Sequence, residues 1–549
     1  MRLYQQFRAS IARTAVAGLG VLVFGSGMSV SASGQAPQTP PMASQPPATR
    51  PVASAQAPSP VASGTPVSME EAVRMALENN LGIQAEKLNP EIQSLAVARA
   101  RAVYSPSLIS TFNQGSRAAP PSDFLSSGVA VVTSGSVFTQ GGLQQQMKWG
   151  GNYQVTLDGS RSTTNAPRTS FSPQLGSNMS AVVNQPLLRN FKIDAFRQQL
   201  LQARTQQTVT DLQLQQRITQ TARNVRAAYY NLVGAIAGLE VAQQSLGLSR
   251  DSLKNNQLRV EVGTMAQIDI TSAEAEVASN EEAVIVQESA IQSAQDQLRT
   301  LIMNPSQPGF WTAVFNPVDQ PILAPRDIDV DAAVQSALAN RTDLLQLKKQ
   351  IESTDISLKF TQNQKLPAVD LQARYGVTGV GGTQFLYDNV AIAGGAPPLP
   401  VSSSVRGFGD VLRDVFGNSF RSWSVALNVS YPLGTSQAQA AFAQTRIQRK
   451  QEDTSLADLQ MAVTAAVREA GRQVNTNLKR VEATRKAREF AEKRLDAENK
   501  RFTVGLSTTF ELVQAQRDLS LAKQRELNAT IDYNRSLVDF EAVQIAPIR

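Results

Sequence analysis

The chain has 549 residues, of which 42% are apolar and 18% are charged, and its net charge is +7. It contains neither cysteine nor histidine, which excludes disulfides, thiol nucleophiles, Ser-His-Asp triads and nearly all zinc sites. We therefore expect no enzyme, no metal site and no cofactor. Acidic residues are interleaved with the basic ones over 479–501, which is typical of a solvated helix face and not of a nucleic-acid-binding surface.

The first 67 residues read as an export signal followed by a linker. Three arginines precede an apolar run over 15–24, and small residues follow it. Because the run is well short of the roughly 20 residues that span a bilayer, we expect residues 1–32 to be a cleaved signal peptide; a retained anchor helix is the alternative. Residues 33–67 are rich in Pro, Ala and Ser, a composition that predicts a flexible linker.

From residue 68 onward the sequence is duplicated. The segment 71–80 matches 332–341, and the same offset places Pro106 on Pro367. Two later pairs of segments also match, 183–187 with 429–433 and 259–263 with 501–505. Each half therefore has the order helix, strand, strand, long helix, turn, helix.

This duplication predicts three segments after the linker. They are a first repeat over 68–304 with a β-hairpin at 107–185, a Pro-rich connection over 305–328, and a second repeat over 329–549 with a β-hairpin at 368–431. Long Gly/Ser-rich loops are expected over 116–148 and 378–420.

The strands are predicted from period-two alternation. Apolar and polar residues alternate over 153–158, 369–377 and 424–431, which gives each strand one apolar and one polar face. A sandwich strand with a buried face is the ordinary alternative. Trp149 and Trp423 stand near strand starts, where aromatic residues suit a membrane interface. Four strands cannot close a barrel, which needs about eight, so a barrel would require several chains.

Two very long helices are predicted over 189–261 and 436–504. Neither segment contains proline, and each would be roughly 100 Å long at 1.5 Å per residue. Apolar residues recur every eleven positions in the first part of each helix and about every seven nearer the turn, which predicts coiled-coil hairpins whose winding changes along their length. A plain coiled-coil stalk is the alternative.

From residue 68 to residue 544 the sequence resembles the TolC-like outer-membrane factor family. The resemblance rests on the duplication, on the Gln-Pro-Leu and Tyr-Pro-Leu junctions at 185–187 and 431–433, and on the turns at 262–264 and 504–506. It implies a mixed α/β membrane protein, a homotrimer whose four strands per chain form a 12-stranded antiparallel β-barrel. A long α-helical barrel of coiled-coil hairpins would continue it. The implied location is the outer membrane of a Gram-negative-type bacterium, with an extension into the periplasm.

The resemblance also implies a function. The chain would be the outer-membrane exit duct of a tripartite efflux or type I secretion system, which passively conducts substrates from an inner-membrane pump of the RND or ABC type and a periplasmic adaptor to the cell exterior. Two alternatives remain open. One is a trimeric coiled-coil stalk or adhesin at the cell surface, and the other is an adaptor, which would have one helical hairpin flanked by compact β domains.

Candidate site residues come from the same resemblance. The tip turns would contact the adaptor, and they comprise Val262, Gly263, Thr264, Val504, Gly505 and Leu506. The alternative is that each turn only reverses a helix pair, with glycine accepting a positive φ. Asp269 and Glu511 stand six positions after the turn glycines and would form a cation-favouring entrance ring; a solvated helix face is the competing interpretation. The family's closing network falls on Phe502, Ser507 and Gln514, so we expect that network to be absent.

Overall fold

The computed structural model describes residues 64–122, 129–167, 169–321, 325–387, 400–434 and 436–544. They all belong to one compact unit, Val61–Arg549. The predicted signal peptide and the linker up to residue 63 lie outside the described residues. Within the described part of the chain, no helix is both long enough and apolar enough to cross a bilayer.

Each half of the chain begins with two consecutive helices. They are α1 (Met69–Asn79) and α2 (Leu81–Ala102) in the first half, and α5 (Val330–Asn340) and α6 (Thr342–Gln364) in the second. The Ser68 hydroxyl accepts a hydrogen bond from the Glu71 N–H at the start of α1, and Asp329 accepts from the Ala332 N–H at the start of α5. These side chains satisfy backbone donors that the first turn leaves free.

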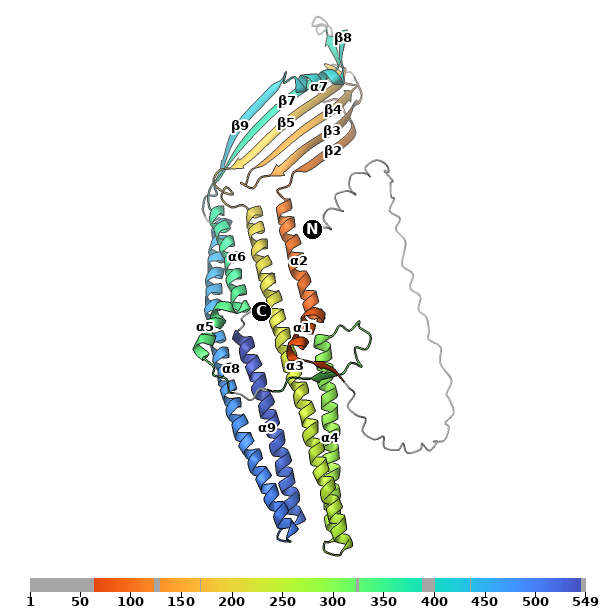
Figure 1. Cartoon of the computed structure of the whole chain (residues 1–549). Helices are drawn as coiled ribbons and strands as arrows, with labels where there is room; N and C mark the ends of the chain where they lie inside the picture. The colour runs from red at the N-terminus through yellow and green to blue at the C-terminus, as the bar shows by residue number, and fades with distance from the viewer. Residues whose placement is uncertain are drawn as a thin grey trace, which may run out of the picture. The chain divides into compact units, whose positions relative to one another are not determined.

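Two helical hairpins follow. The first joins α3 (Ala195–Glu261) to α4 (Gln267–Ile302), and the second joins α8 (Gln437–Thr503) to α9 (Thr509–Gln544). Because α3 and α8 each contain 67 residues, each is about 100 Å long, as the absence of proline predicted. Figure 1 shows that α4 and α9 lie beside the lower parts of α3 and α8.

The helices lie in rows. Near the sheet the order is α2, α3, α6, α8, and near the tips it is α4, α3, α9, α8. At both levels the described part of the chain therefore has a row of four helices.

A core at mid-height joins these rows to the short elements. Tyr229 of α3 is fully buried against α1 and α4, and its hydroxyl donates to the Val67 carbonyl at 3.1 Å. Val67 belongs to β1 (Thr65–Val67), which pairs in parallel with β6 (Phe315–Pro317). A second cluster around Tyr533 and Val467 packs α5 against α8 and α9. The two clusters occupy equivalent places in the two halves.

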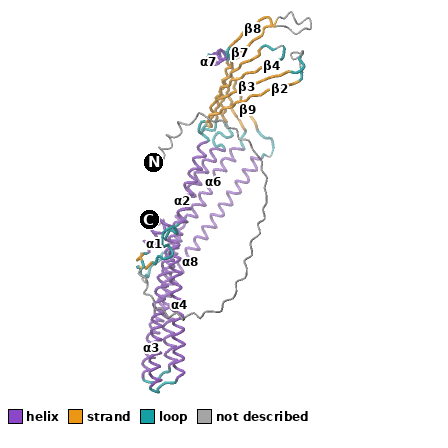
Figure 2. The backbone as a smooth tube through the Cα atoms, turned by 90° about the vertical axis from the view of Figure 1, so that its right-hand side faces the viewer, coloured by secondary structure: helices purple, strands orange, loops and turns teal. Residues whose placement is uncertain are grey.

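The sheet is antiparallel and has seven strands among the described residues, in the order β2-β3-β4-β5-β7-β8, with β9 also paired to β7. The strands are β2 (Ser107–Ala119), β3 (Val132–Gln146), β4 (Asn152–Thr164), β5 (Phe171–Pro186), β7 (Ala368–Tyr387), β8 (Pro400–Arg406) and β9 (Arg421–Ser430). β8 pairs only with the outer end of β7, and β9 pairs with its inner part, from Ala368 to Val377. Six strands therefore lie side by side in the inner part of the sheet, and Figure 2 shows β8 at its outer end.

The number of strands differs from the expected four per chain, because the sheet has seven strands among the described residues. Residues 107–186 form four strands where one hairpin was expected, and β3 lies within the predicted loop 116–148. β3 is rich in Gly, Ser, Thr and Gln, so its apolar alternation is weak and its composition resembles a loop. Its backbone is nevertheless paired with β2 on one side and β4 on the other.

The predicted loop at 378–420 is likewise partly structured. β7 extends through it to Tyr387, and β8 and the helix α7 (Phe408–Phe416) occupy much of the remainder. The glycines at 379, 381 and 382 suggested a loop, but in the structure they belong to a paired strand.

The strand register gives the sheet two different faces. On one face lie the residues Leu108, Phe112, Leu143, Tyr153, Val155, Leu157, Met179, Val183, Leu371, Tyr375, Trp423, Val425, Leu427 and Val429. The opposite face is mainly polar, and its side chains bond across strands: Asn178 donates to Asp158 at 3.1 Å, and Gln372 donates to Asn184 at 2.9 Å. An exposed apolar band over a whole sheet face is typical of contact with lipid or with another protein surface.

The helix α7 lies on the apolar face at its outer end. Its Val411 and Val415 are fully buried, and glycines make the close approach possible. A Cβ atom at Gly379 would overlap the Val411 carbonyl, and one at Gly159 would press on the Phe408 ring. Figure 2 shows α7 beside the strands, on one side of the sheet.

Candidate functional site

The two helical hairpins end in turns of the same construction. In the first turn Gly263 has φ +76°, its N–H donates to the Val260 carbonyl, and the Thr264 N–H donates to the Arg259 carbonyl. In the second turn Gly505 has φ +78°, its N–H donates to Phe502, and the Leu506 N–H donates to Arg501. Both are Schellman caps, in which glycine takes the left-handed conformation that other residues adopt at a cost.

Apolar side chains project from these turns into solvent. Val262 is 78% exposed, Val504 68% and Leu506 72%, and the first turns of α4 and α9 add Ile268 and Phe510. No described atom lies within 4 Å of where a Cβ would stand on either glycine. A reversal of two helices does not require exposed apolar residues, so their presence indicates a contact surface.

The two carboxylates predicted for an entrance ring lie just behind the turns. Asp269 is half-buried in the first turn of α4, and Glu511 is exposed in the first turn of α9. Their placement is equivalent in the two hairpins. The two surroundings differ, because α9 begins with a reciprocal cap: the Glu511 N–H donates to the Thr508 hydroxyl, and the Thr508 N–H donates to the Glu511 carboxylate.

Ser507 lies between two carboxylates. Its hydroxyl is 2.9 Å from Glu511 and also contacts the buried Glu498. Hydrogen bonds from the Ser507 hydroxyl and the Thr508 N–H lower the pKa of Glu511 below its usual 4.5, because they favour the charged form. Glu511 is therefore an anion at neutral pH, as an entrance ring requires.

The side chains at the three positions of the family's closing network make separate contacts, and those of Ser507 are with Glu498 and Glu511. Phe502 is buried, and the Arg259 guanidinium lies 4.4 Å from the centroid of its ring. Gln514 donates to Asp518, one turn further along α9.

A different ion pair joins the two hairpins, and sequence reasoning missed it. The Arg517 guanidinium of α9 donates to the Glu276 carboxylate of α4 at 2.7 Å, and Glu276 is only 6% exposed. The carboxylate raises the pKa of Arg517 above its usual value. The sequence did contain a signal for this pair, because Glu276 places a carboxylate on the inner face of an amphipathic helix. It did not show which cation that carboxylate would meet.

A hollow of about 520 Å³ just above the tips is lined by α3, α8 and α9. Asn256, on its wall, is fully buried, and its side-chain oxygen and nitrogen have no hydrogen-bond partner among the described residues. Buried polar atoms without partners cost free energy unless water reaches them. The seam between the hairpins is thus packed less completely than the core of either half.

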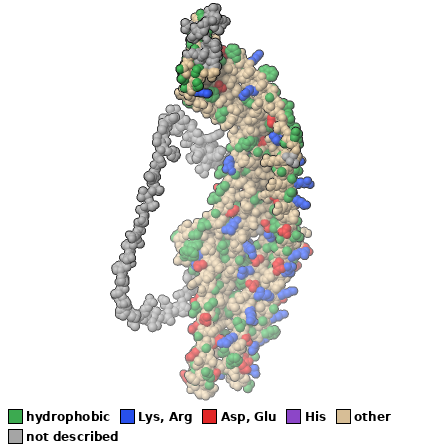
Figure 3. Space-filling model, turned by 180° about the vertical axis from the view of Figure 1, so that it is seen from behind, with side chains coloured by type: hydrophobic (Ala, Val, Ile, Leu, Met, Phe, Trp, Pro, Cys, Tyr) green, Lys and Arg blue, Asp and Glu red, His purple; other side chains and the backbone are tan. Residues whose placement is uncertain are grey.

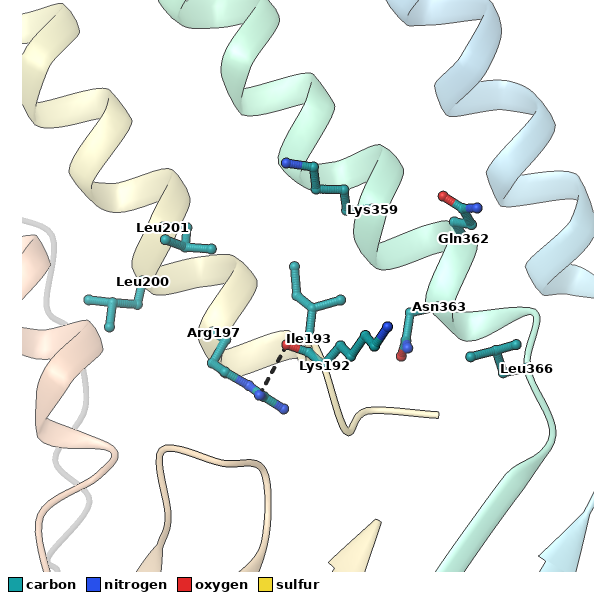
Figure 4. A pocket seen from close by; sticks show the side chains of 9 residues that line it. All are labelled: Lys192, Ile193, Arg197, Leu200, Leu201, Lys359, Gln362, Asn363 and Leu366. Carbon is teal, nitrogen blue, oxygen red and sulfur yellow. Dashed lines mark hydrogen bonds between the residues drawn. The ribbon is translucent and has the colours of Figure 1, made fainter. Parts of the chain in front are cut away.

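A second hollow, of about 640 Å³, lies at the opposite ends of the helices, between α3 and α6 (Figure 4). Arg197 and Lys359 face it together with Leu200, Leu201 and Leu366. The Arg197 guanidinium forms an ion pair with the Asp194 carboxylate at 3.0 Å and donates a hydrogen bond to the Lys192 carbonyl. None of the nine residues that line this hollow carries a carboxylate, so it offers no acid–base pair for catalysis.

The helical surface itself is charged with both signs. Figure 3 shows lysine and arginine interspersed with aspartate and glutamate over the helical part of the face it draws. Among the residues the structure describes, no cluster of acidic side chains is suited to hold a metal ion.

The comparisons with known proteins agree with this architecture. The family described as Outer membrane efflux protein matches residues 152–303 and 333–543. Outer membrane protein TolC of Escherichia coli (strain K12) is 24% identical over 318 residues, which are 56% of this chain. The match spans 58% of that relative's length.

Solved structures match over most of the chain. A membrane protein from Pseudomonas aeruginosa has a TM-score of 0.62 at 16% identity and covers 87% of this chain and 93% of its own. The outer-membrane channel OprN has a TM-score of 0.60 at 14% identity over 87% and 89%. The Neisseria gonorrhoeae MtrE outer membrane channel, in its open state, has a TM-score of 0.57 at 16% identity over 87% and 88%. These matches confirm the predicted fold class, long coiled-coil helices combined with antiparallel strands.

Proposed function

The chain belongs to the outer membrane efflux protein family, and on that premise we propose that it is the outer-membrane exit duct of a tripartite efflux or type I secretion system. It conducts substrates passively from an inner-membrane pump of the RND or ABC type, through a periplasmic adaptor, to the cell exterior. The observation that carries this proposal is the two-faced sheet joined to helices of about 100 Å. A wall that is apolar outside and polar inside suits a water-filled barrel in lipid.

The duct is a homotrimer in the outer membrane, and its helices extend into the periplasm. Within one chain the outward edges of β2 and β9 have no partner strand among the described residues. An open edge in lipid leaves backbone N–H and C=O groups unpaired, so copies must join edge to edge until the ring closes. Residues 1–32 are the cleaved signal and 33–67 the linker, and the repeats 68–304 and 329–549 are joined by 305–328.

The tips are the docking surface for the adaptor. Their exposed apolar residues support this assignment, because a hydrophobic contact would cover Val262, Val504 and Leu506. Gly263 and Gly505 fix the shape of the two turns, and Thr264 shares its turn position with Leu506.

Asp269 and Glu511 form the entrance ring. Threefold repetition would place six carboxylates around the axis, and such a ring favours cations. The equivalent first-turn positions of the two residues, just behind the tip turns, support this role.

A trimeric stalk or adhesin is the second candidate. It would leave the apolar face of the sheet against water, where Val425, Leu427 and Trp423 are all more than half exposed in a single chain. The cost of exposing such a band favours the duct.

Reconstitution into planar lipid bilayers tests the duct. The signal-cleaved protein and the Asp269→Asn, Glu511→Gln double variant are compared for conductance and ion selectivity. We expect discrete cation-selective channels whose selectivity falls in the variant. Channels with unchanged selectivity would remove the entrance ring and keep the duct, whereas a folded protein that never conducts would favour the stalk.

A further inference from the structure

The six strands of the main sheet alternate in direction from edge to edge. β2 leaves α2 and runs away from the helices, and β9 runs back toward α8, with β3, β4, β5 and β7 alternating between them. An even number of alternating strands leaves two edges that run antiparallel. A copy of the chain can therefore place its β2 beside β9 of its neighbour without breaking the antiparallel order.

The first half of the chain contributes two more strands to these six than the second half does. The matched prolines Pro106 and Pro367 precede β2 and β7, and the matched junctions at Pro186 and Pro432 follow β5 and β9, so four strands in the first half stand where β7 and β9 stand in the second. The family match begins at residue 152, where β4 starts, so β2 and β3 lie outside the matched region. The first half of this chain thus carries two strands more than a duplicated hairpin would give.

We propose that three copies close the membrane part as one barrel of eighteen strands, six from each chain, in which β9 of one copy pairs with β2 of the next. This inference rests on the trimeric duct proposed above. A barrel of eighteen strands would be about as wide as the helical tunnel that leads to it.

The dimensions of the two parts support this number. Three rows of four helices, spaced about 8–10 Å apart, give a ring of about 100–120 Å in circumference. Eighteen strands spaced about 4.8 Å apart and tilted by about 40° form a barrel with a circumference of about 110 Å. Twelve strands would close at only about 75 Å and would narrow the duct at the junction.

The two edges are also chemically compatible. β2 presents Leu108 and Phe112 on the apolar face, and β9 presents Val425, Leu427 and Val429 on that same face. Pairing β9 with β2 in a register that keeps these residues on one face makes the apolar band continuous around the barrel. Since every strand then has two neighbours, no edge remains open to lipid.

Disulfide mapping tests the closure, because the chain contains no native cysteine. One cysteine replaces Val425, and the second is moved along β2 through Leu108, Ser110 and Phe112. After mild oxidation we expect covalent dimers and trimers on non-reducing gels from at least one of these pairs. The matched controls place the second cysteine at Ile109 or Thr111, whose side chains leave the opposite face, and they should link poorly.

A second variant measures the width. Deleting residues 107–151 joins Pro106 to β4 and leaves four strands per chain, and the barrel diameter falls by about a third. We expect its channels to conduct less than the full-length channels, by up to about twofold. Conducting channels with no β9–β2 link at any position would overturn the eighteen-stranded barrel and keep the duct. A protein that neither links nor conducts would overturn both.

Discussion

The Arg259 guanidinium lies 4.4 Å above the ring of Phe502 and thereby joins the tip of α3 to the tip of α8. Cation–π contacts contribute about 0.5–1 kcal/mol at partly exposed sites. Arg259→Gln removes this contact between the two tips, and the ratio of open to closed entrances should therefore rise about two- to fivefold per chain. Open probability in planar bilayers checks this. Arg494→Gln, which removes an ion pair within one hairpin, is the matched control and should leave the ratio unchanged. An equal effect of both variants would show that the contact does not hold the entrance.

The pair Arg517–Glu276 predicts an asymmetric loss of stability. Arg517→Met leaves a buried carboxylate without its partner and should cost about 1–3 kcal/mol, whereas Glu276→Gln leaves only a half-exposed cation and should cost less. Thermal melting of the purified protein measures both. The exposed pair Arg250–Glu281 provides a control, because Arg250→Met should change the melting temperature little. Equal losses of stability in Arg517→Met and Glu276→Gln would contradict the assigned burial of Glu276.

The lowered pKa of Glu511 predicts how cation selectivity depends on pH. A carboxyl group with a depressed pKa stays charged above that value and loses its charge as the pH falls through it. In an Asp269→Asn background, the selectivity that depends on Glu511 should therefore persist to a pH below 4.5. Ser507→Ala removes the larger of the two stabilising hydrogen bonds, and the midpoint should move upward. If the pH midpoint of the selectivity is the same in Ser507→Ala, this serine does not influence the selectivity.

The helix α7 should lie at the outer boundary of the lipid. It covers the apolar face near Val377 and Gly379, ten to twelve residues into β7, which is about where a membrane strand ends. A nitroxide on Phe416→Cys should be more accessible to oxygen than to a water-soluble nickel reagent. The same label on Asn428→Cys, on the polar face, should show the reverse. Equal nickel access at both sites would place α7 in water.

Much of the fold followed from periodicity and duplication. The absence of proline predicted α3 and α8 almost to their ends, because nothing in those segments interrupts a helix. The strong alternation of apolar and polar residues around Val369 and Val425 likewise predicted the strands β7 and β9.

β3 escaped prediction because backbone pairing, and not side-chain pattern, defines it. Its Gly-Gly pair at 141–142 and its glutamines look like a loop until the neighbouring strands β2 and β4 are in place. The ion pair Arg517–Glu276 and the contact of Arg259 with Phe502 were missed for a related reason. Each joins residues more than 200 positions apart, and only tertiary packing shows that they meet.

The most direct test of the account is a single-particle reconstruction of the detergent-solubilised, signal-cleaved protein. The account predicts a threefold particle with one lumen running from the tips at Gly263 and Gly505, between twelve helices, into one barrel made from the sheets of all three copies. Monomers, or particles in which each sheet packs separately against a partner without enclosing a shared lumen, would contradict it.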